Sequence, residues 1–230
     1  MMLKSLRDEV CEANLELVRQ GLVLYTFGNV SGISRQDGLV VIKPSGVSYD
    51  KLKPSDLVVT DLEGNCEEGN LRPSSDLPTH LVLYRTFHSI GGIAHTHSSY
   101  ATAWAQAKRK IPCLGTTHAD YFHGPIPVTE PLKPSEIKKD YEENTGQLIV
   151  RCFAGLDPEE ISAVLVSSHG PFCWGSTAYD AAHTAVIVEE LARIAFFSVT
   201  LNPEVSQIAS NLLDKHFFRK HGPGAYYGQK

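Results

Sequence analysis

Apolar and polar residues recur along the chain with two different periods, and the changes of period mark where helices and strands are expected. Apolar side chains at helical spacing predict a helix over residues 3–20, which Gly21 would end. Short apolar runs bounded by glycine, proline or serine predict strands. These runs lie at 22–27, 39–46, 56–65, 92–97 and 163–175, with a tight loop at 28–32. The run at 163–175 is expected to form a strand, a turn at 169–171 and a short return strand.

Helical spacing returns in longer segments between and after these runs. Helices are expected at 73–87, 98–110, 133–146, 177–201 and 205–222. Ser75 or Asp76 can cap the first of these helices, and Gly146 would end the polar helix at 133–146. No repeat or linker interrupts the order of strands and helices. The chain is therefore expected to form one α/β domain over residues 1–230.

The composition is that of an ordinary globular protein and argues against several classes. Apolar residues make up 42% and charged residues 20% of the 230 residues, which is enough to bury a sizeable core. A formal charge of -5 argues against a nucleic-acid binder, and no apolar stretch approaches the roughly 18 residues of a membrane span. The N-terminus lacks the apolar middle of a signal peptide, and the five cysteines form no CxxC pair. A cytoplasmic protein with reduced thiols is expected.

Two histidines one residue apart stand in the apolar run "GGIAHTHSSY" at 91–100. In a strand, residues i and i+2 point to the same face, so His95 and His97 can converge on one ion while Thr96 points into the packed side. The motif is short, and two hydrogen-bonded histidines near a sheet end would give the same pattern. The pair alone leaves both interpretations open.

Two more potential ligands favour a metal. His169 stands in "SSHGPF", at the end of another apolar run and before a glycine-proline turn. Asp76 could supply a carboxylate, although capping of its helix is the alternative role. Three neutral imidazoles and one carboxylate suit Zn²⁺, or Mn²⁺ or Co²⁺ in its place.

Three short loops rich in small and hydroxyl residues indicate an anion site. They are "GNVSG" at 28–32, "PSG" at 44–46 and "PSS" at 73–75. Such turns present backbone N–H groups and hydroxyls to an anion, and phosphate is the natural candidate. Lys43 beside "PSG" adds a positive partner. Each loop is a weak signal because these residues are common in loops, but together with a metal set they suggest a phosphorylated, oxygen-rich small substrate.

Seven blocks spread along the chain carry a resemblance to a known family. They are "GNVSG", "VIKPSGV", "RPSSDLPTH", "GGIAHTHSSYATAWAQ", "GTTHADYF", "SSHGPFCWG" and "KHFFRKHGPGAYYGQK". These blocks resemble the L-ribulose-5-phosphate 4-epimerases of the class II (metal-dependent) aldolase superfamily. The resemblance implies a three-layer α/β/α fold around a mixed, largely antiparallel central sheet. It also implies a cyclic homotetramer with sites at subunit interfaces.

The same resemblance implies roles for individual residues. The metal, expected to be zinc, would be held by Asp76, His95, His97 and His169. The phosphosugar would be held in the small loops by Gly28, Asn29, Lys43, Ser45, Gly46, Ser74 and Ser75. Asp120 in "THADYF" and Tyr227 in "AYYGQ" match the acid/base pair. Blocks associated with the site, without a defined role, also contain Thr116, His216 and Arg219.

The implied reaction inverts C4 of L-ribulose 5-phosphate and gives D-xylulose 5-phosphate. C4 carries no acidic hydrogen, so a retro-aldol cut between C3 and C4 avoids a very high barrier. The metal would stabilise the enediolate that remains, while glycolaldehyde phosphate rotates before the bond forms again on its other face. Asp120 and Tyr227 would transfer protons on the two faces.

Two other functions fit parts of the pattern. A class II aldolase, such as one acting on fuculose 1-phosphate, shares the implied fold and the three histidines. That group typically has a glutamate at the position of Asp76, which also serves as acid/base. A non-catalytic module like the adducin head would be expected to lack the metal set. Aspartate at 76, together with "THADYF" and "AYYGQK", favours the epimerase.

Overall fold

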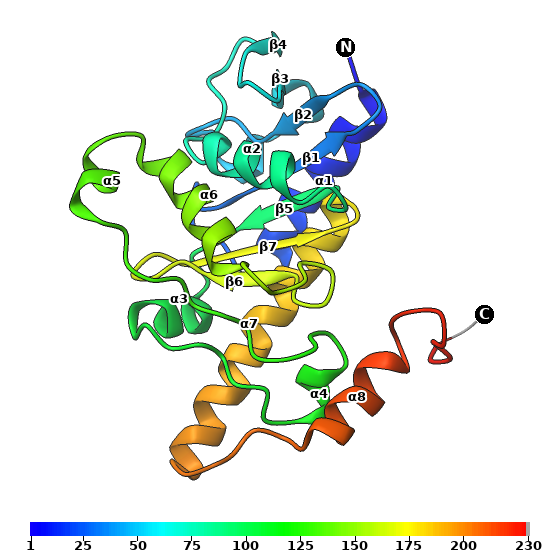
Figure 1. The fold of residues 1–230 in the computed structure, drawn as a ribbon. Helices are drawn as coiled ribbons and strands as arrows, with labels where there is room; N and C mark the ends of the chain where they lie inside the picture. Colours follow the sequence, from blue (N-terminus) through cyan, green and yellow to red (C-terminus); the bar gives the residue numbers. More distant parts are fainter. Residues whose placement is uncertain (229–230) are drawn as a thin grey trace.

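A single seven-stranded sheet, in the order β4-β3-β2-β1-β5-β7-β6, forms the centre of the computed structural model, which describes residues 1–228 (Figure 1). The strands are β1 (Asn29–Ser34), β2 (Leu39–Ile42), β3 (Val58–Asp61), β4 (Cys66–Glu68), β5 (Gly92–His95), β6 (Ala163–Leu165) and β7 (Pro171–Gly175). All neighbouring strands pair antiparallel. Within the described residues, parallel pairing is confined to an isolated bridge between Val128 and Leu165.

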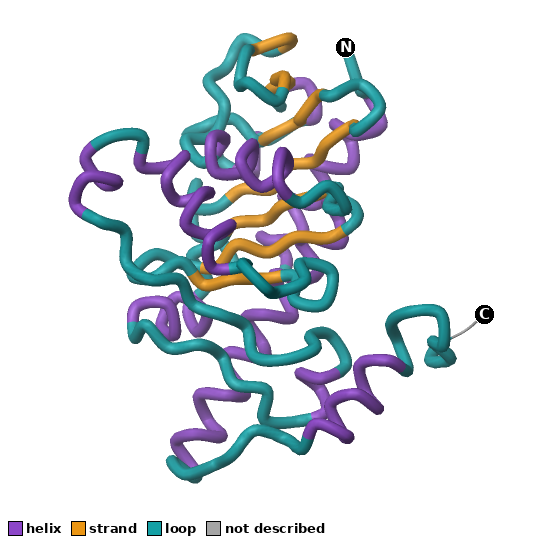
Figure 2. The backbone as a smooth tube through the Cα atoms, viewed as in Figure 1, coloured by secondary structure: helices purple, strands orange, loops and turns teal. Residues whose placement is uncertain are grey.

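Helices cover both faces of the sheet, which confirms the expected three layers (Figures 1 and 2). The α-helices are α1 (Lys4–Arg19), α2 (Leu77–Thr86), α3 (Ser99–Gln106), α4 (Thr116–Ala119), α5 (Pro134–Lys138), α6 (Tyr141–Cys152), α7 (Ala178–Leu201) and α8 (Ser210–Phe218). Two short 3-10 turns, η1 (Tyr49–Lys51) and η2 (Pro54–Asp56), precede β3. α2 packs with α6 on one face, and α1 with α7 on the other. Within residues 1–228, none of the helices has the length and apolar character to cross a membrane.

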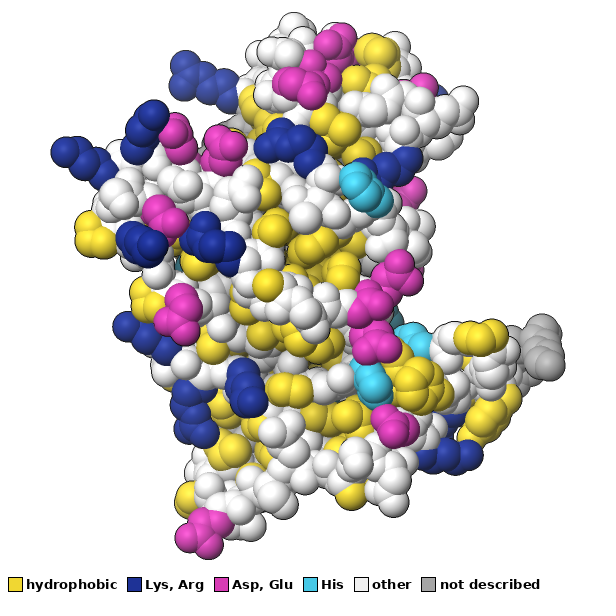
Figure 3. Space-filling model, in the orientation of Figure 1, with side chains coloured by type: hydrophobic (Ala, Val, Ile, Leu, Met, Phe, Trp, Pro, Cys, Tyr) yellow, Lys and Arg dark blue, Asp and Glu magenta, His cyan; other side chains and the backbone are white. Residues whose placement is uncertain are grey.

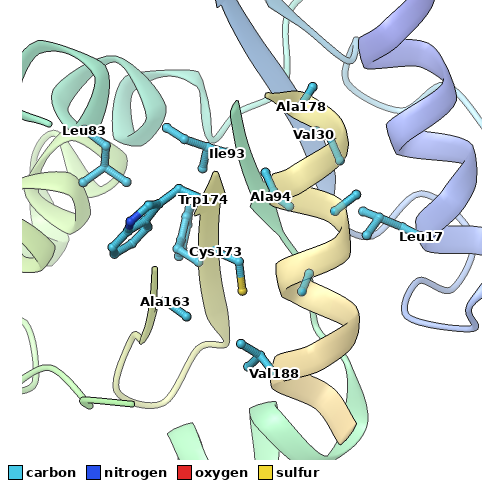
Figure 4. Packing of buried hydrophobic residues seen from close by; sticks show 14 of the residues in the cluster. Leu17, Val30, Leu83, Ile93, Ala94, Ala163, Cys173, Trp174, Ala178 and Val188 are labelled. Atoms are coloured by element: carbon cyan, nitrogen blue, oxygen red, sulfur yellow. The ribbon is translucent and has the colours of Figure 1, made fainter. Parts of the chain in front are cut away.

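Alternation along the central strands explains why both faces need a helical layer. Ile93 pairs with Trp174, and Figure 4 shows both on the side of Leu83 in α2. The next pair, Ala94 and Cys173, points to the side of α7. The side chains of these four strand residues are at most 1% exposed. Because successive residues of a strand point to opposite faces, apolar residues at consecutive positions require cover on both sides.

The strand expected at 22–27 and the loop expected at 28–32 are both wrong. Residues 22–28 contain no regular element, and β1 begins at Asn29. β1 lies between β2 and β5, so its polar side chains are buried and bonded inside the protein: Ser31 Oγ lies 2.7 Å from His80 Nδ1. Leu24, in contrast, is 66% exposed. The apolar run at 22–27 was therefore mistaken for the strand. The polar side chains of β1 can be buried because they have hydrogen-bond partners inside the protein.

The single polar helix expected at 133–146 is also wrong. Two helices, α5 and α6, occupy this region, and Asp140 between them has a left-handed backbone with φ of 53°. Gly146 lies inside α6 and does not end it. A Cβ added to Gly146 would lie 2.7 Å from Val82 Cβ in α2, so the glycine is needed for close packing of the two helices. The last helix also begins later than expected, at Ser210.

The end of the described chain leaves the three-layer body. Residues 210–228, comprising α8 and the segment after it, stand out to one side, and we call them the C-terminal arm (Figures 1 and 3). Phe217 is the buried residue of α8, and α8 contacts α4. Tyr226 and Tyr227 are each 60% exposed. The last two residues of the predicted tail, 229–230, lie outside the described residues.

Candidate functional site

One end of the sheet gathers the residues that the sequence assigned to metal and phosphosugar. Antiparallel pairing sets His95, the last residue of β5, opposite Asn29 of β1 and Phe172 of β7. A pocket of about 440 Å³ opens at this end. Every predicted metal and phosphosugar residue lines it, and five further residues complete the lining: Thr26, Phe27, Pro44, Tyr141 and Glu142.

The three histidines converge through their Nε2 atoms. His97 Nε2 lies 3.0 Å from His95 Nε2 and 3.1 Å from His169 Nε2. Zn–N bonds of about 2.0–2.1 Å at tetrahedral angles would set ligand nitrogens about 3.3–3.4 Å apart, so small adjustments would accommodate an ion. β5 ends at His95, so His97 belongs to the following loop and not to the strand as expected. The convergence of the pair nevertheless agrees with the prediction.

Hydrogen bonding and burial favour the ligand form of these histidines. His95 Nδ1 lies 2.9 Å from the carbonyl oxygen of Pro171, to which a protonated Nδ1 donates. The lone pair of His95 Nε2 then faces the cluster. Burial lowers the pKa of His169 to about 4, and burial also lowers the pKa of His97. Neutral imidazoles are the form that binds a divalent cation, so the donor set fits a metal.

Asp76 lies beside the histidine cluster and does not cap its helix. It occupies the N-cap position of α2, yet its side chain accepts no capping hydrogen bond. Its carboxylate instead accepts a 2.7 Å hydrogen bond from Asn29 Nδ2. Burial opposes ionisation, but His95, His80 and the Asn29 amide outweigh it and hold the pKa of Asp76 below its usual value. The group of three mutually close ligands does not itself include Asp76.

Two of the small loops pair with each other beside a buried lysine. The Ser45 amide donates to Arg72 O, and the Ser74 amide donates to Lys43 O, at 2.9 and 3.0 Å. Lys43 is 2% exposed, and its Nζ lies 4.6 Å from the centre of the Tyr49 ring. Burial is the sole cause of a pKa of about 8 for Lys43, so no described carboxylate offsets its charge. A buried cation without a counter-ion favours an anionic ligand.

Gly28 and Asn29, at the start of β1, determine the shape of the site. Gly28 has φ of +76°, and an added Cβ would lie 2.6 Å from His95 O. Only glycine therefore allows the chain to enter β1 so close to the end of β5. Asn29 donates its amide hydrogens to Ser74 Oγ and Asp76, at 3.0 and 2.7 Å. In this arrangement the Asn29 amide holds Asp76.

The predicted acid/base residues form a second cluster, apart from the pocket. Asp120 accepts hydrogen bonds of 2.9 and 2.7 Å from Arg219 and one of 3.0 Å from His216. Burial opposes ionisation, but Arg219 and His216 outweigh it and lower the pKa of Asp120. Thr116 begins α4, and its carbonyl accepts from the Asp120 amide. The Arg219 guanidinium lies 4.7 Å from the ring centre of Tyr227.

This second cluster, formed by Asp120, Thr116 and residues of the C-terminal arm, does not meet the pocket within one chain. The pocket lining includes none of Thr116, Asp120, His216, Arg219 and Tyr227. In Figure 1 the arm projects on the opposite side of the body from the His95 end of β5. The structure therefore brings the metal and phosphosugar residues together and leaves the acid/base pair elsewhere.

Sequence reasoning missed Tyr141 and Glu142 in the lining. Tyr141 Oη lies 3.4 Å from His169 Nδ1. Both residues begin α6, inside the stretch that was expected to be one polar surface helix. The break at Asp140 turns this end of α6 towards the pocket, and the sequence shows no motif there that would have indicated it.

The family follows from a match over most of the chain. Residues 8–196 match the model of the class II aldolase and adducin N-terminal domain. The chain belongs to this family. Class II aldolases are typically dependent on a divalent metal, which agrees with the three-histidine cluster. Adducin domains share the family, so membership suggests an enzyme without naming its reaction.

Several solved structures of other proteins are similar to this chain over most of its length. An L-fuculose 1-phosphate aldolase is 27% identical with a TM-score of 0.78, over 92% of this chain and 94% of that one. YgbL from Klebsiella pneumoniae, provisionally assigned as an aldolase/epimerase/decarboxylase, is 26% identical with a TM-score of 0.73. The match covers 94% of this chain and 99% of YgbL. An L-fuculose-1-phosphate aldolase from Thermus thermophilus is 23% identical with a TM-score of 0.68, and the match covers 86% of this chain and 97% of that one. The last comparison concerns the fold alone.

Proposed function

We propose that the protein is a metal-dependent epimerase that interconverts L-ribulose 5-phosphate and D-xylulose 5-phosphate. The observation that carries the proposal is the convergence of three histidine Nε2 atoms in one pocket with the buried cation of Lys43. A substrate with adjacent oxygens at one end and a phosphate at the other matches both features. Zinc is the expected ion, and a reducing cytoplasm is the expected setting of the five free cysteines.

The phosphate end would be held by the paired loops. Lys43 supplies the charge, and the backbone amides of Gly46 and Ser75 donate to no protein acceptor within residues 1–228. A phosphate held there tethers the two-carbon aldehyde fragment while the carbonyl group of the fragment rotates. Rotation about a fixed phosphate exposes the other face of the aldehyde without release of the fragment.

The other end of the sugar would lie against His95, His97, His169 and Asp76. A bound divalent ion supplies Lewis-acid stabilisation of the negative charge that develops when C3–C4 breaks. Asn29 fixes the Asp76 carboxylate, and Pro171 O fixes the proton on His95 Nδ1. The chemistry balances by itself: the C4 hydroxyl loses a proton as C3–C4 breaks, and the new C4 alkoxide gains one after the bond re-forms.

The acid/base groups would come from another copy of the chain in a homotetramer. Asp120 and Tyr227 are the proposed pair, and within one chain they lie away from the pocket. Tyr227 is exposed, and Arg219 and Lys220 each lie 4.7 Å from its ring centre. The phenol and these cations thus lie together on the arm, where another copy of the chain could meet them.

The main alternative is an aldolase of the fuculose-phosphate type, which the 27% identical structure supports. Aspartate at position 76 argues against it, because a glutamate that also moves protons is expected there. A coupled assay for D-xylulose 5-phosphate should show turnover of L-ribulose 5-phosphate, and metal analysis of the same sample should show bound ion. Faster condensation of dihydroxyacetone phosphate with an aldehyde would support the aldolase. A chain without metal or turnover would support an adducin-like module.

A further inference from the structure

We propose that Tyr141 is a positioning residue: its phenol oxygen accepts a hydrogen bond from His169 Nδ1 and so presents His169 Nε2 to the metal. The inference rests on the proposed metal site and adds a residue to it. Tyr141 Oη and His169 Nδ1 are 3.4 Å apart, and the two ring centres are 6.3 Å apart. Tyr141 lies behind His169 and not among the three converging nitrogens.

The backbone before α6 directs Tyr141 into the pocket. Asp140 has φ of 53° and ψ of 45°, a left-handed conformation that non-glycine residues seldom adopt. This residue separates α5 from α6 and makes Tyr141 the first residue of α6. The tyrosine is half-buried and lines the pocket. A strained residue directly before a pocket side chain is typical of a functional position.

Close packing with α2 fixes the same end of α6. Thr79 Oγ1 of α2 donates a 2.6 Å hydrogen bond to Glu142 O. Gly146, one turn further along α6, lies against Val82 of α2, where an added Cβ would come within 2.7 Å of Val82 Cβ. α2 also begins directly after Asp76. Asp76 and Tyr141 are therefore carried by two helices that are locked together.

The chemistry of imidazole gives this contact its consequence. A neutral histidine has one protonated and one unprotonated ring nitrogen, and the partner of one decides the role of the other. His95 Nδ1 has a backbone partner in Pro171 O, at 2.9 Å. The corresponding partner of His169 Nδ1 is Tyr141 Oη. Such outer partners of metal-bound histidines typically contribute about 10–100-fold to metal affinity.

The test compares metal binding in Tyr141→Phe and in wild type, by chelator competition with Zn²⁺. We expect binding to weaken about tenfold, the lower end of that range, because 3.4 Å is a long hydrogen bond. The ¹⁵N NMR spectrum of the imidazoles should show less of the Nδ1-protonated form of His169 in metal-free Tyr141→Phe. Tyr179→Phe, at an exposed tyrosine of α7, is the matched control and should match wild type.

A double-mutant cycle separates positioning from a general effect on the fold. If Tyr141 acts through His169, Tyr141→Phe should have no further effect on Zn²⁺ affinity in a His169→Gln protein. An equal loss in both backgrounds would overturn the inference, as would unchanged affinity and tautomer in Tyr141→Phe. Failure of wild-type protein to bind any divalent metal would instead overturn the proposed function, and the inference with it.

Discussion

In the pocket, His95 is 1% exposed and its Nδ1 is bonded to a backbone carbonyl, whereas in the C-terminal arm Tyr227 is 60% exposed. The pocket residues stand at strand ends, at the start of α6 and in the short loops between the elements. The arm is joined to the body by polar contacts, such as those of Asp120 with Arg219 and His216, and by the buried side chain of Phe217. The candidate metal and phosphate sites thus each contain a buried group, His95 and Lys43, whereas the candidate acid/base residue Tyr227 is exposed on the arm.

This difference matches the two kinds of work that the proposed reaction requires. Metal ligands must keep their separations within tenths of an ångström, which a sheet end with buried supports can provide. A proton donor from another subunit must instead remain accessible until the copies assemble. The exposed arm with its single buried side chain, Phe217, suits that role. We therefore expect that substitutions can inactivate the pocket and the arm separately. Mixed oligomers should then be able to combine an intact pocket with an intact arm.

The largest expected effect concerns pairs of variants. Tyr227→Phe in the arm should lower turnover by about 10²–10⁴-fold, the range for loss of an acid/base group. His97→Asn in the pocket should also lower turnover strongly, because Lewis-acid stabilisation is lost with the metal. Only His97→Asn should also release the metal. If sites form between subunits, random mixed oligomers should regain about one quarter of wild-type activity, because half the pockets and half the arms are intact. Co-expression followed by activity assay measures this recovery.

The control for this experiment is each variant expressed alone, with its metal content and oligomeric state determined. Tyr227→Phe should retain its metal. No recovery in mixed oligomers that are properly assembled would contradict the division of the site between copies. Unchanged turnover in Tyr227→Phe would remove Tyr227 from the mechanism.

A smaller effect is expected where the pocket holds the phosphate. Lys43→Met should raise KM about 10–100-fold and leave metal binding unchanged, because a charge-assisted hydrogen bond is lost. In wild type, kcat/KM should fall as pH rises through about 8, where Lys43 loses the proton that its burial destabilises. Lys51→Met, at an exposed lysine of the neighbouring 3-10 turn, should change neither value. An unaltered KM in Lys43→Met would exclude Lys43 from phosphate binding.

The sequence was informative where chemistry and local pattern coincide. His95 ends a short apolar strand and His97 follows it in the loop, while Asp76 directly precedes a helix near the predicted start. Both features are local, so spacing and strand period could indicate them. The small loops around Ser45 and Ser74 were also found, because turn residues next to apolar runs mark the edge of a sheet.

Other features depend on contacts that no local pattern contains. β1 is a central strand with buried Asn29 and Ser31, whose partners lie far away in the chain. Gly146 is typical of a helix end by sequence, and only the approach of Val82 explains its place within α6. The roles of Asp120 and Tyr227 were predicted through family resemblance alone, since their proposed substrate contacts lie outside a single chain.

The smallest expected effect concerns how the arm is held, and it sharpens the contrast with the pocket. His123 Nδ1 lies 3.0 Å from Glu160, and its Nε2 lies 2.8 Å from Asp214 in α8. Burial opposes protonation of His123, but Asp214 and Glu160 outweigh it and raise its pKa above the usual 6.5. The stabilisation is therefore complete below pH 6.5 and is lost as pH rises through the raised pKa.

Because both carboxylates are largely exposed, solvent screening limits this contribution to about 0–1 kcal/mol. Hydrogen exchange, corrected for its intrinsic pH dependence, should show α8 amides losing up to about fivefold protection from about pH 6 to about pH 8, while β5 amides do not change. His123→Gln should remove the pH dependence, and His88→Gln, at an exposed histidine, should preserve it. Equal loss of protection in α8 and β5 would mean that the arm and the pocket open together, which would contradict their separate construction.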